Sequence, residues 1–433
     1  IKAGLFVIGI GLIIGLLAYT QIIVNKLRYD NKEIVRLYAN MIVDIVADDN
    51  DANIDFVFEN VIQKAKFPLI QTNTKKVPQI WKNLPKYLID PMGPLFVKWR
   101  YLPQLTPWLI AFLKNATSTT SNRTSEALVP LLSDAVEQHK SLTEGTKAQN
   151  WIADSKFSYA YRNRTAFEQD ATSWAIKSAA GMKPDVLTGS EVQDEEPICG
   201  PMIQCLAVLK GQGHILNPHG YVLSLVNALE EVGGKCRKAD VLDFERDGHK
   251  LTAVITNTGR IECDKAVLTA GIWSKSLAAK LGLKVPLETE RGYHVMYKSP
   301  SEMPRNPMMI TIGKFAVTPM AEGLRCAGTV ELGGIKLGRS KAPIRLIRRR
   351  VSEVFPNLTY ENSEEWMGFR PSTPDSLPLI GEIAQSGIYT AFGHQHVGLT
   401  AGAKTGRLIS DIVSQRMPNI DMSPYDPNRY AAR

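Results

Sequence analysis

Cysteine is scarce in this chain of 433 residues. Its five cysteines are an odd number and include no C-x-x-C pair, so neither a disulfide framework nor a zinc site is predicted. This usage fits a reducing compartment. The chain also contains no internal repeat and no low-complexity segment.

Acidic residues are outnumbered, and the formal net charge is +8. The densest basic cluster, residues 339–355 ("RSKAPIRLIRRRVSEVF"), places four apolar residues on one helical face: Ile344, Ile347, Val351 and Val354. Its arginines are therefore predicted to form the solvated face of an amphipathic helix. Nucleic acid is not expected as a partner.

Charge is missing altogether between Lys2 and Lys26. As a helix, this run would span roughly 34 Å, enough to cross the core of a bilayer. The sequence therefore predicts a transmembrane helix over residues 1–25, followed by a helical linker over residues 26–74. The slight basic excess at Lys26 and its neighbours predicts a membrane-anchored chain whose catalytic part is cytoplasmic.

A complete dinucleotide fingerprint is missing too. G-x-G-x-x-G needs its third glycine three residues after the second, whereas "VIGIGLIIGLLAYT" has Gly9, Gly11 and Gly15. A degenerate nucleotide turn stays open as the alternative to a membrane helix. Residues 1–74 also loosely resemble the membrane-anchored start of bacterial sensor histidine kinases, but no D-x-G-x-G motif of an ATP site follows them.

Residues 75–116 are dense in proline, tryptophan and lysine. The prolines divide this segment into short helices and turns. Trp81, Trp99 and Trp108 alternate with basic residues, which fits a membrane surface or a lid packed over an active site.

Strand and helix patterns alternate further along the chain. "KFSYAYRN" predicts a strand with three aromatic residues on one face, and Asn217 with Pro218 predicts the start of a helix. Hairpin turns are expected at Asp247-Gly248 and Thr258-Gly259, before an apolar strand that stops at Ala270-Gly271. This order is typical of the second half of a nucleotide-binding sheet, whose ligands bind at the carboxyl ends of the strands.

Four motifs follow one another toward the C-terminus: "VLTAGIWS", "ERGYHV", "WMGFRPSTPDSLPLIG" and "YTAFGHQHVGLTAGAKTGRLISDI". In order and spacing they resemble the FAD-dependent amino-acid oxidases and dehydrogenases of the D-amino-acid oxidase superfamily. The resemblance covers residues 75–433. The segment rich in proline and tryptophan is similar to the bacterial D-amino-acid dehydrogenase branch.

The resemblance implies an α/β (α+β) fold. It consists of a partial FAD-binding nucleotide fold and an antiparallel-sheet substrate domain, preceded by the transmembrane helix. Four parts are expected beyond residue 74. A helical lid with part of the substrate domain covers residues 75–209, and part of the FAD-binding domain covers residues 210–285. The rest of the substrate domain covers residues 286–372, and the C-terminal part of the FAD-binding domain covers residues 373–433.

The last motif predicts a strand, a glycine turn and a helix whose first turns carry small residues. Free amide groups at such a helix start stabilise the negative charge that reduced flavin develops. The resemblance puts the isoalloxazine beside this turn, which implies flavin contacts at Gly393, His394, Gly398, Leu399 and Thr400. The H-x-H pair in the turn has no third ligand nearby in sequence, so no metal site is predicted.

Arg370 stands at the end of a predicted strand. Guanidinium binds a carboxylate through two parallel hydrogen bonds, and the resemblance implies this role for Arg370. Tyr293 is similar to a family position that lines the substrate site, although a tyrosine on an alternating strand is as often part of the core. By the same analogy, the phosphate side of FAD and its adenine are contacted by further residues: Gly271, Trp273, Ser274 and Val241.

The activity implied is FAD-dependent oxidation of a D-amino acid, or a related amine, by hydride transfer to flavin. Its product is an imino acid, which water hydrolyses to an oxo acid. A membrane quinone is the expected electron acceptor. The alternative is an inactive flavoenzyme fragment fused to a membrane-anchored, signalling-type N-terminus.

Overall fold

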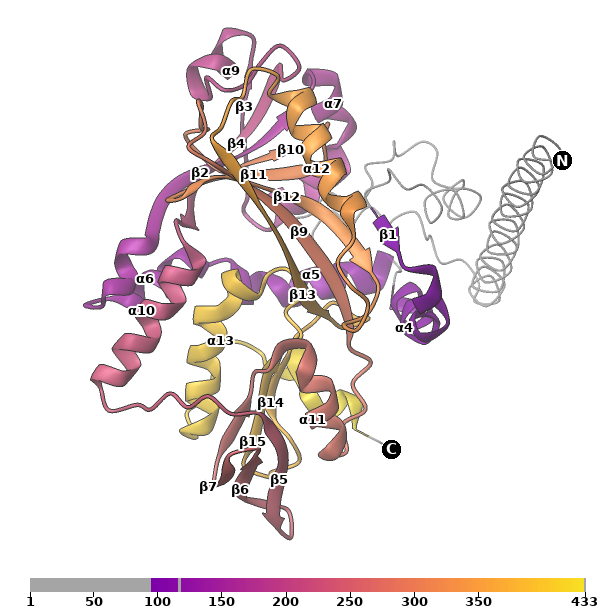
Figure 1. Ribbon diagram of the computed structural model, residues 1–433, viewed down its shortest axis with the longest axis vertical. Coiled ribbons are helices and arrows are strands. Elements are labelled where there is room, and N and C mark those ends of the chain that lie inside the picture. The colour runs from indigo at the N-terminus through magenta and orange to yellow at the C-terminus, as the bar shows by residue number, and fades with distance from the viewer. Residues whose placement is uncertain (1–94, 116–117, 432–433) are drawn as a thin grey trace, which may run out of the picture.

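The computed structural model describes residues 95–115 and 118–431 (Figure 1). This part of the chain contains one nine-stranded sheet and two three-stranded sheets. The large sheet has the order β13-β9-β12-β11-β10-β2-β4-β3, with β1 beside β12. Its strands are β1 (Leu95–Val97), β2 (Ile152–Tyr161), β3 (Asp185–Thr188), β4 (Cys205–Ile215), β9 (Glu288–Lys298), β10 (Met308–Ile310), β11 (Phe315–Met320), β12 (Gly323–Leu332) and β13 (Asn362–Ser372).

The large sheet is mixed, because β2 pairs with β10 and β1 with β12 in parallel while its other pairs are antiparallel. Helix α12 (Lys341–Val354) covers one face with Ile344, Ile347 and Val351 buried against it. This confirms the amphipathic helix predicted from the basic cluster. On the opposite face, α7 (Arg164–Gln169) and α8 (Ala171–Ala179) cover β2 and β4.

The two small sheets lie below the large one in Figure 1. One joins β14 (Leu379–Glu382), β15 (Ile388–Phe392) and β8 (Ala266–Leu268), with β15 and β8 parallel. The other joins β5 (Val241–Asp247), β6 (Lys250–Thr256) and β7 (Gly259–Glu262) through the two predicted turns. Leu251, Leu268 and Ile388 share one core between the sheets, and α13 (Gly398–Val413) packs against β14 and β15.

Helix α10 (Pro218–Glu231) begins as the sequence predicts. The Asn217 side chain accepts a hydrogen bond from the Gly220 amide at 3.0 Å, and Pro218 is the first helical residue. The remaining helices are η2 (Trp99–Tyr101), α4 (Leu102–Asn115), α5 (Ser118–Leu132), α6 (Ala135–Thr143), η3 (Lys147–Trp151), α9 (Ser190–Glu195), η4 (Gly271–Trp273), α11 (Ser274–Lys280), η5 (Ser423–Tyr425) and η6 (Pro427–Tyr430).

The predicted membrane anchoring requires correction. Across residues 95–115 and 118–431, no helix is both long enough and apolar enough to span a bilayer. The apolar run over residues 1–25, on which that prediction rested, lies outside the described residues, as does the predicted linker over residues 26–74. We therefore withdraw the membrane-anchored, cytoplasm-facing location. The incomplete glycine fingerprint and the histidine-kinase resemblance fall on the same segment and stay predictions.

Candidate active site

Arg370 lies two residues before the end of β13, directly opposite Glu290 of β9. Its guanidinium extends over the backbone of Gly292, where a Cβ atom would stand only 2.4 Å from Arg370 Cζ. A glycine at position 292 is therefore what leaves room for the guanidinium. The close approach to the Gly292 backbone thus sets the position of the Arg370 guanidinium, the predicted carboxylate-binding group.

Burial governs the charges around Arg370. It lowers the pKa of Arg370 to about 10, although the facing Glu290 acts in the opposite direction. The guanidinium is thus still charged at neutral pH. Burial also raises the pKa of Glu290, against the pull of Arg370. Charges that are withdrawn from water in this way interact more strongly than exposed ones.

His294 lies on the same face of β9 as Gly292, since alternate residues of a strand share a face. Its ring stacks on Trp366 with centroids 5.0 Å apart. Burial, reinforced by Arg325 and Arg370, lowers the pKa of His294 to about 3, so the ring is neutral at physiological pH. The motif "ERGYHV" was noted in the sequence, but neither His294 nor Glu290 was singled out there as a candidate site residue.

Tyr293 points to the other face of β9. It is buried in the core beneath α12, its hydroxyl donates to Glu331 Oε2 at 2.6 Å, and it accepts from the Ser340 amide at 3.2 Å. Glu331 also forms a buried salt bridge with Arg291 at 3.0 Å. The structure does not bring Tyr293 together with Arg370. Its contacts are those of a core residue, the alternative that the sequence left open.

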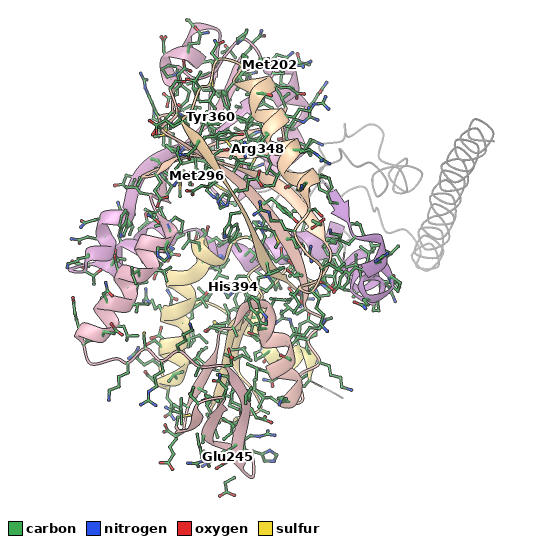
Figure 2. The ribbon with its side chains drawn as sticks, viewed as in Figure 1. Met202, Glu245, Met296, Arg348, Tyr360 and His394 are labelled. Atoms are coloured by element: carbon green, nitrogen blue, oxygen red, sulfur yellow. The ribbon has the colours of Figure 1, made fainter. Side chains whose placement is uncertain are left out.

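The glycine turn predicted to contact flavin connects β15 to α13. Gly393 has a φ of +87°, a left-handed conformation that favours glycine. The Gln395 amide donates to the Pro371 carbonyl at 3.0 Å, next to Arg370 in sequence. Figure 2 shows Met296 on the large sheet and His394 below it, beside α13. The predicted turn and Arg370 are therefore brought together.

The first turn of α13 contains Gly398, Leu399 and Thr400, and its N-cap, Val397, makes no side-chain capping bond. The amide groups of this turn thus have no side-chain acceptor. Such a helix start can bind the carbonyl and anionic side of a cofactor ring. His394 lies beneath it with Nε2 3.0 Å from Thr405 Oγ1, and burial lowers its pKa to about 4.

His139 of α6 supports this helix start from behind. Its Nε2 lies 2.9 Å from the Leu399 carbonyl oxygen, and its Nδ1 lies 2.6 Å from the Tyr221 hydroxyl of α10. Because a carbonyl only accepts, Nε2 carries the proton and Nδ1 accepts from Tyr221. Sequence reasoning missed His139, since the bond to Leu399 spans 260 positions and nothing local indicates it.

The segment after β8 reaches the same edge as the flavin turn, because β8 and β15 are parallel and their carboxyl ends coincide. Gly271 has a φ of +57° and starts η4. Trp273 meets Phe369, the neighbour of Arg370, edge to face at 6.0 Å, while Ser274 is fully buried. Val241 is the first residue of β5, in the other three-stranded sheet.

These residues fit the flavin end of FAD. An uncapped helix start faces the edge at which the two turns meet, and two exposed apolar side chains, Trp273 and Leu399, remain available to a planar ring. Gly393, His394, Gly398, Leu399 and Thr400 would hold the ring. Gly271, Trp273 and Ser274 would lie toward the phosphates.

Comparison with known proteins agrees with this arrangement. A family model described as "FAD dependent oxidoreductase" (DAO) matches residues 98–412. A D-amino-acid oxidase of Bradyrhizobium diazoefficiens is 38% identical over 359 residues, covering 82% of this chain and 85% of the relative. A D-amino acid dehydrogenase of the same organism is 24% identical over 354 residues, covering 80% and 84%.

Among solved structures, glycine oxidase from Geobacillus kaustophilus is similar, with a TM-score of 0.60 and 20% identity. The match covers 73% of this chain and 84% of that one, and it supports the mixed α/β fold. The family match spans well over half of the chain. The chain belongs to the DAO family of FAD-dependent oxidoreductases, with FAD as its cofactor.

Proposed function

We propose that this chain oxidises a D-amino acid, or a related amine, to an imino acid that water hydrolyses to an oxo acid. One observation supports this most directly. The buried guanidinium of Arg370 sits over Gly292 at the end of β13, and the backbone beside it is bonded to the turn that fits flavin. The proposed carboxylate-binding group and the proposed hydride-acceptor site would thus be neighbours.

Arg370 would hold the substrate carboxylate through two parallel hydrogen bonds. Arg370 keeps its charge at neutral pH, and its guanidinium is held over Gly292. It would therefore fix the position of the substrate carboxylate and, through it, of the α-carbon. His294 is neutral and adds no competing charge. FAD, when bound, supplies the hydride-accepting chemistry. The amides of the 393–400 segment would stabilise the charge that develops on it.

The other end of the cofactor has less support. We assign the phosphate side to Gly271, Trp273 and Ser274, and the adenine to the backbone of Val241, by resemblance to the family. The usual glycine fingerprint would belong to the start of the fold. Here Gly9, Gly11 and Gly15 occupy that stretch, outside the described residues.

The test uses the full chain, incubated with FAD and passed through gel filtration. We expect flavin absorbance to co-elute with protein, and D-amino acids to reduce the flavin much faster than their L-enantiomers do. Parallel assays with oxygen, a redox dye and a short-chain quinone identify the electron acceptor. A chain that retains no FAD and oxidises no amino acid would overturn the proposal in favour of an inactive flavoenzyme fragment.

A further inference from the structure

Arg325 shares a face of the large sheet with Arg370. Its neighbours on β12, Leu324 and Cys326, are buried in the core beneath α12, so strand alternation turns Arg325 to the opposite face. In the register of β12 and β9, Arg325 lies directly opposite Met296. Met296 is two residues from His294, which marks the active-site face.

The two guanidinium groups act on the same histidine. Arg325 and Arg370 each lower the pKa of His294, and Arg325 also lowers that of Arg370. His294 is therefore close to both positive charges. Its Nδ1 is buried and has no hydrogen-bond partner among the described residues. A ligand between the two arginines would find both charges and this free nitrogen.

Negative charge is lacking beside Arg325. Within the described part of the chain, no carboxylate forms a salt bridge with Arg325, while Glu364, farther along the same row, pairs with Lys298 at 3.3 Å. Glu290 faces Arg370 rather than Arg325. A partly desolvated guanidinium without a counter-ion is unfavourable, and a bound anion relieves this.

We propose that Arg325 binds a second anionic group, and that the substrate is therefore an acidic D-amino acid. Its α-carboxylate lies on Arg370 and its side-chain carboxylate on Arg325. This inference rests on the proposed function. The register supports two separate anions, because the Arg370 guanidinium lies over Gly292 while the backbone of Arg325 lies opposite Met296, four residues or about 13 Å farther along β9 at about 3.3 Å per residue.

A binding experiment tests the inference without turnover. The FAD-loaded chain is titrated calorimetrically with succinate and with succinamate, which has the same shape but one carboxylate. We expect succinate to bind at least tenfold more tightly, and Arg325→Gln to abolish that preference while leaving succinamate binding unchanged. Arg349→Gln, an exposed position on α12, serves as the matched control and should keep the preference.

A kinetic experiment separates this inference from the proposed function. We expect Arg325→Gln to lower kcat/KM for D-glutamate 10- to 100-fold and to lower that for D-glutamine much less, with partial recovery in Arg325→Lys. Equal losses on both substrates would mean that the two arginines share one carboxylate, and would overturn the inference. If D-glutamine is oxidised as well as D-glutamate by the unmodified chain, the inference fails while the proposed function stands. If succinate binding depends on Arg325 but no amino acid is oxidised, the proposed function fails instead.

Discussion

Ser372 and His394 pair through their backbones in an antiparallel bridge, joining the end of β13 to the turn that precedes α13. The pairing involves main-chain groups, so it does not depend on side-chain identity at either position. It fixes Arg370, two residues upstream, relative to the helix start that fits flavin. Substitution of Arg370 should therefore change substrate binding and leave the cofactor in place.

Arg370→Met is expected to lower kcat/KM about 30-fold to several-thousand-fold, because an unpaired substrate carboxylate in a buried site costs about 2 to 5 kcal/mol. Arg370→Lys should recover only part of the loss, since lysine cannot form the bidentate contact. Steady-state kinetics on the FAD-loaded variants measure both. Flavin absorbance should stay unchanged. Unaltered kinetics in the methionine variant would remove Arg370 from the active site.

Gly393→Ala is expected to weaken FAD retention and to destabilise the fold by about 1 to 3 kcal/mol, because the left-handed backbone would strain any side chain. A Cβ there would also lie 3.3 Å from Thr373 Cγ2. The control is Gly406→Ala in α13, where a Cβ meets nothing within 4 Å. That change should stabilise the helix by up to about 1 kcal/mol. Thermal unfolding with and without FAD compares them, and equal effects would contradict the role given to Gly393.

Local patterns in the sequence predicted the parts of the fold that local physics determines. Asn217 and Pro218 start α10 because an N-cap needs no distant partner. The basic cluster forms α12 because its apolar residues repeat at helical spacing. The strand, glycine turn and helix around Gly393 follow the same logic. Arg370 was chosen because its motif resembles that of a known family, and its role stays a prediction.

Long-range contacts were not predictable in this way. In "ERGYHV" the alternation separates Tyr293 from Gly292 and His294, but nothing in the strand itself says which face meets the cofactor. Tyr293 was singled out from the sequence, whereas in the structure Gly292 and His294 lie on the face that carries the Arg370 guanidinium. Arg325 carried no such signal, because a charged residue that alternates with apolar neighbours is typical of any strand with one polar face.

The neutral form of His394 should make the fold sensitive to acid. Its pKa is about 6.5 when unfolded and about 4 when folded, so between these values the unfolded chain binds a proton that the folded chain does not. The free energy of unfolding therefore falls as pH falls from about 6.5 to about 4, by on the order of 3 kcal/mol in total. Above pH 6.5 this contribution is fully present.

Urea unfolding of His394→Gln at pH 7.5 and pH 4.5 measures this effect. The variant should lose stability at pH 7.5, where its bond to Thr405 is lost, but should show a smaller decrease between the two pH values than the unmodified chain. His219→Gln, at an exposed position, should keep the full decrease. The same decrease in all three proteins would show that His394 is protonated equally in both states.

His139 provides a test of whether the start of α13 holds the cofactor. Replacing it with alanine removes the bond from Nε2 to the Leu399 carbonyl and leaves the buried Tyr221 hydroxyl without its partner, and an unsatisfied buried group costs about 1 to 3 kcal/mol. Because Leu399 belongs to the first turn of α13, this turn should loosen and FAD should dissociate more readily.

Tyr221→Phe is the matched control, since it removes the hydroxyl but keeps the bond from His139 Nε2 to Leu399. We expect gel filtration to show a clear loss of bound flavin in His139→Ala and little loss in Tyr221→Phe. Equal retention in both variants would mean that the helix start is held by packing alone, through Ala401, Leu408 and their neighbours in the core.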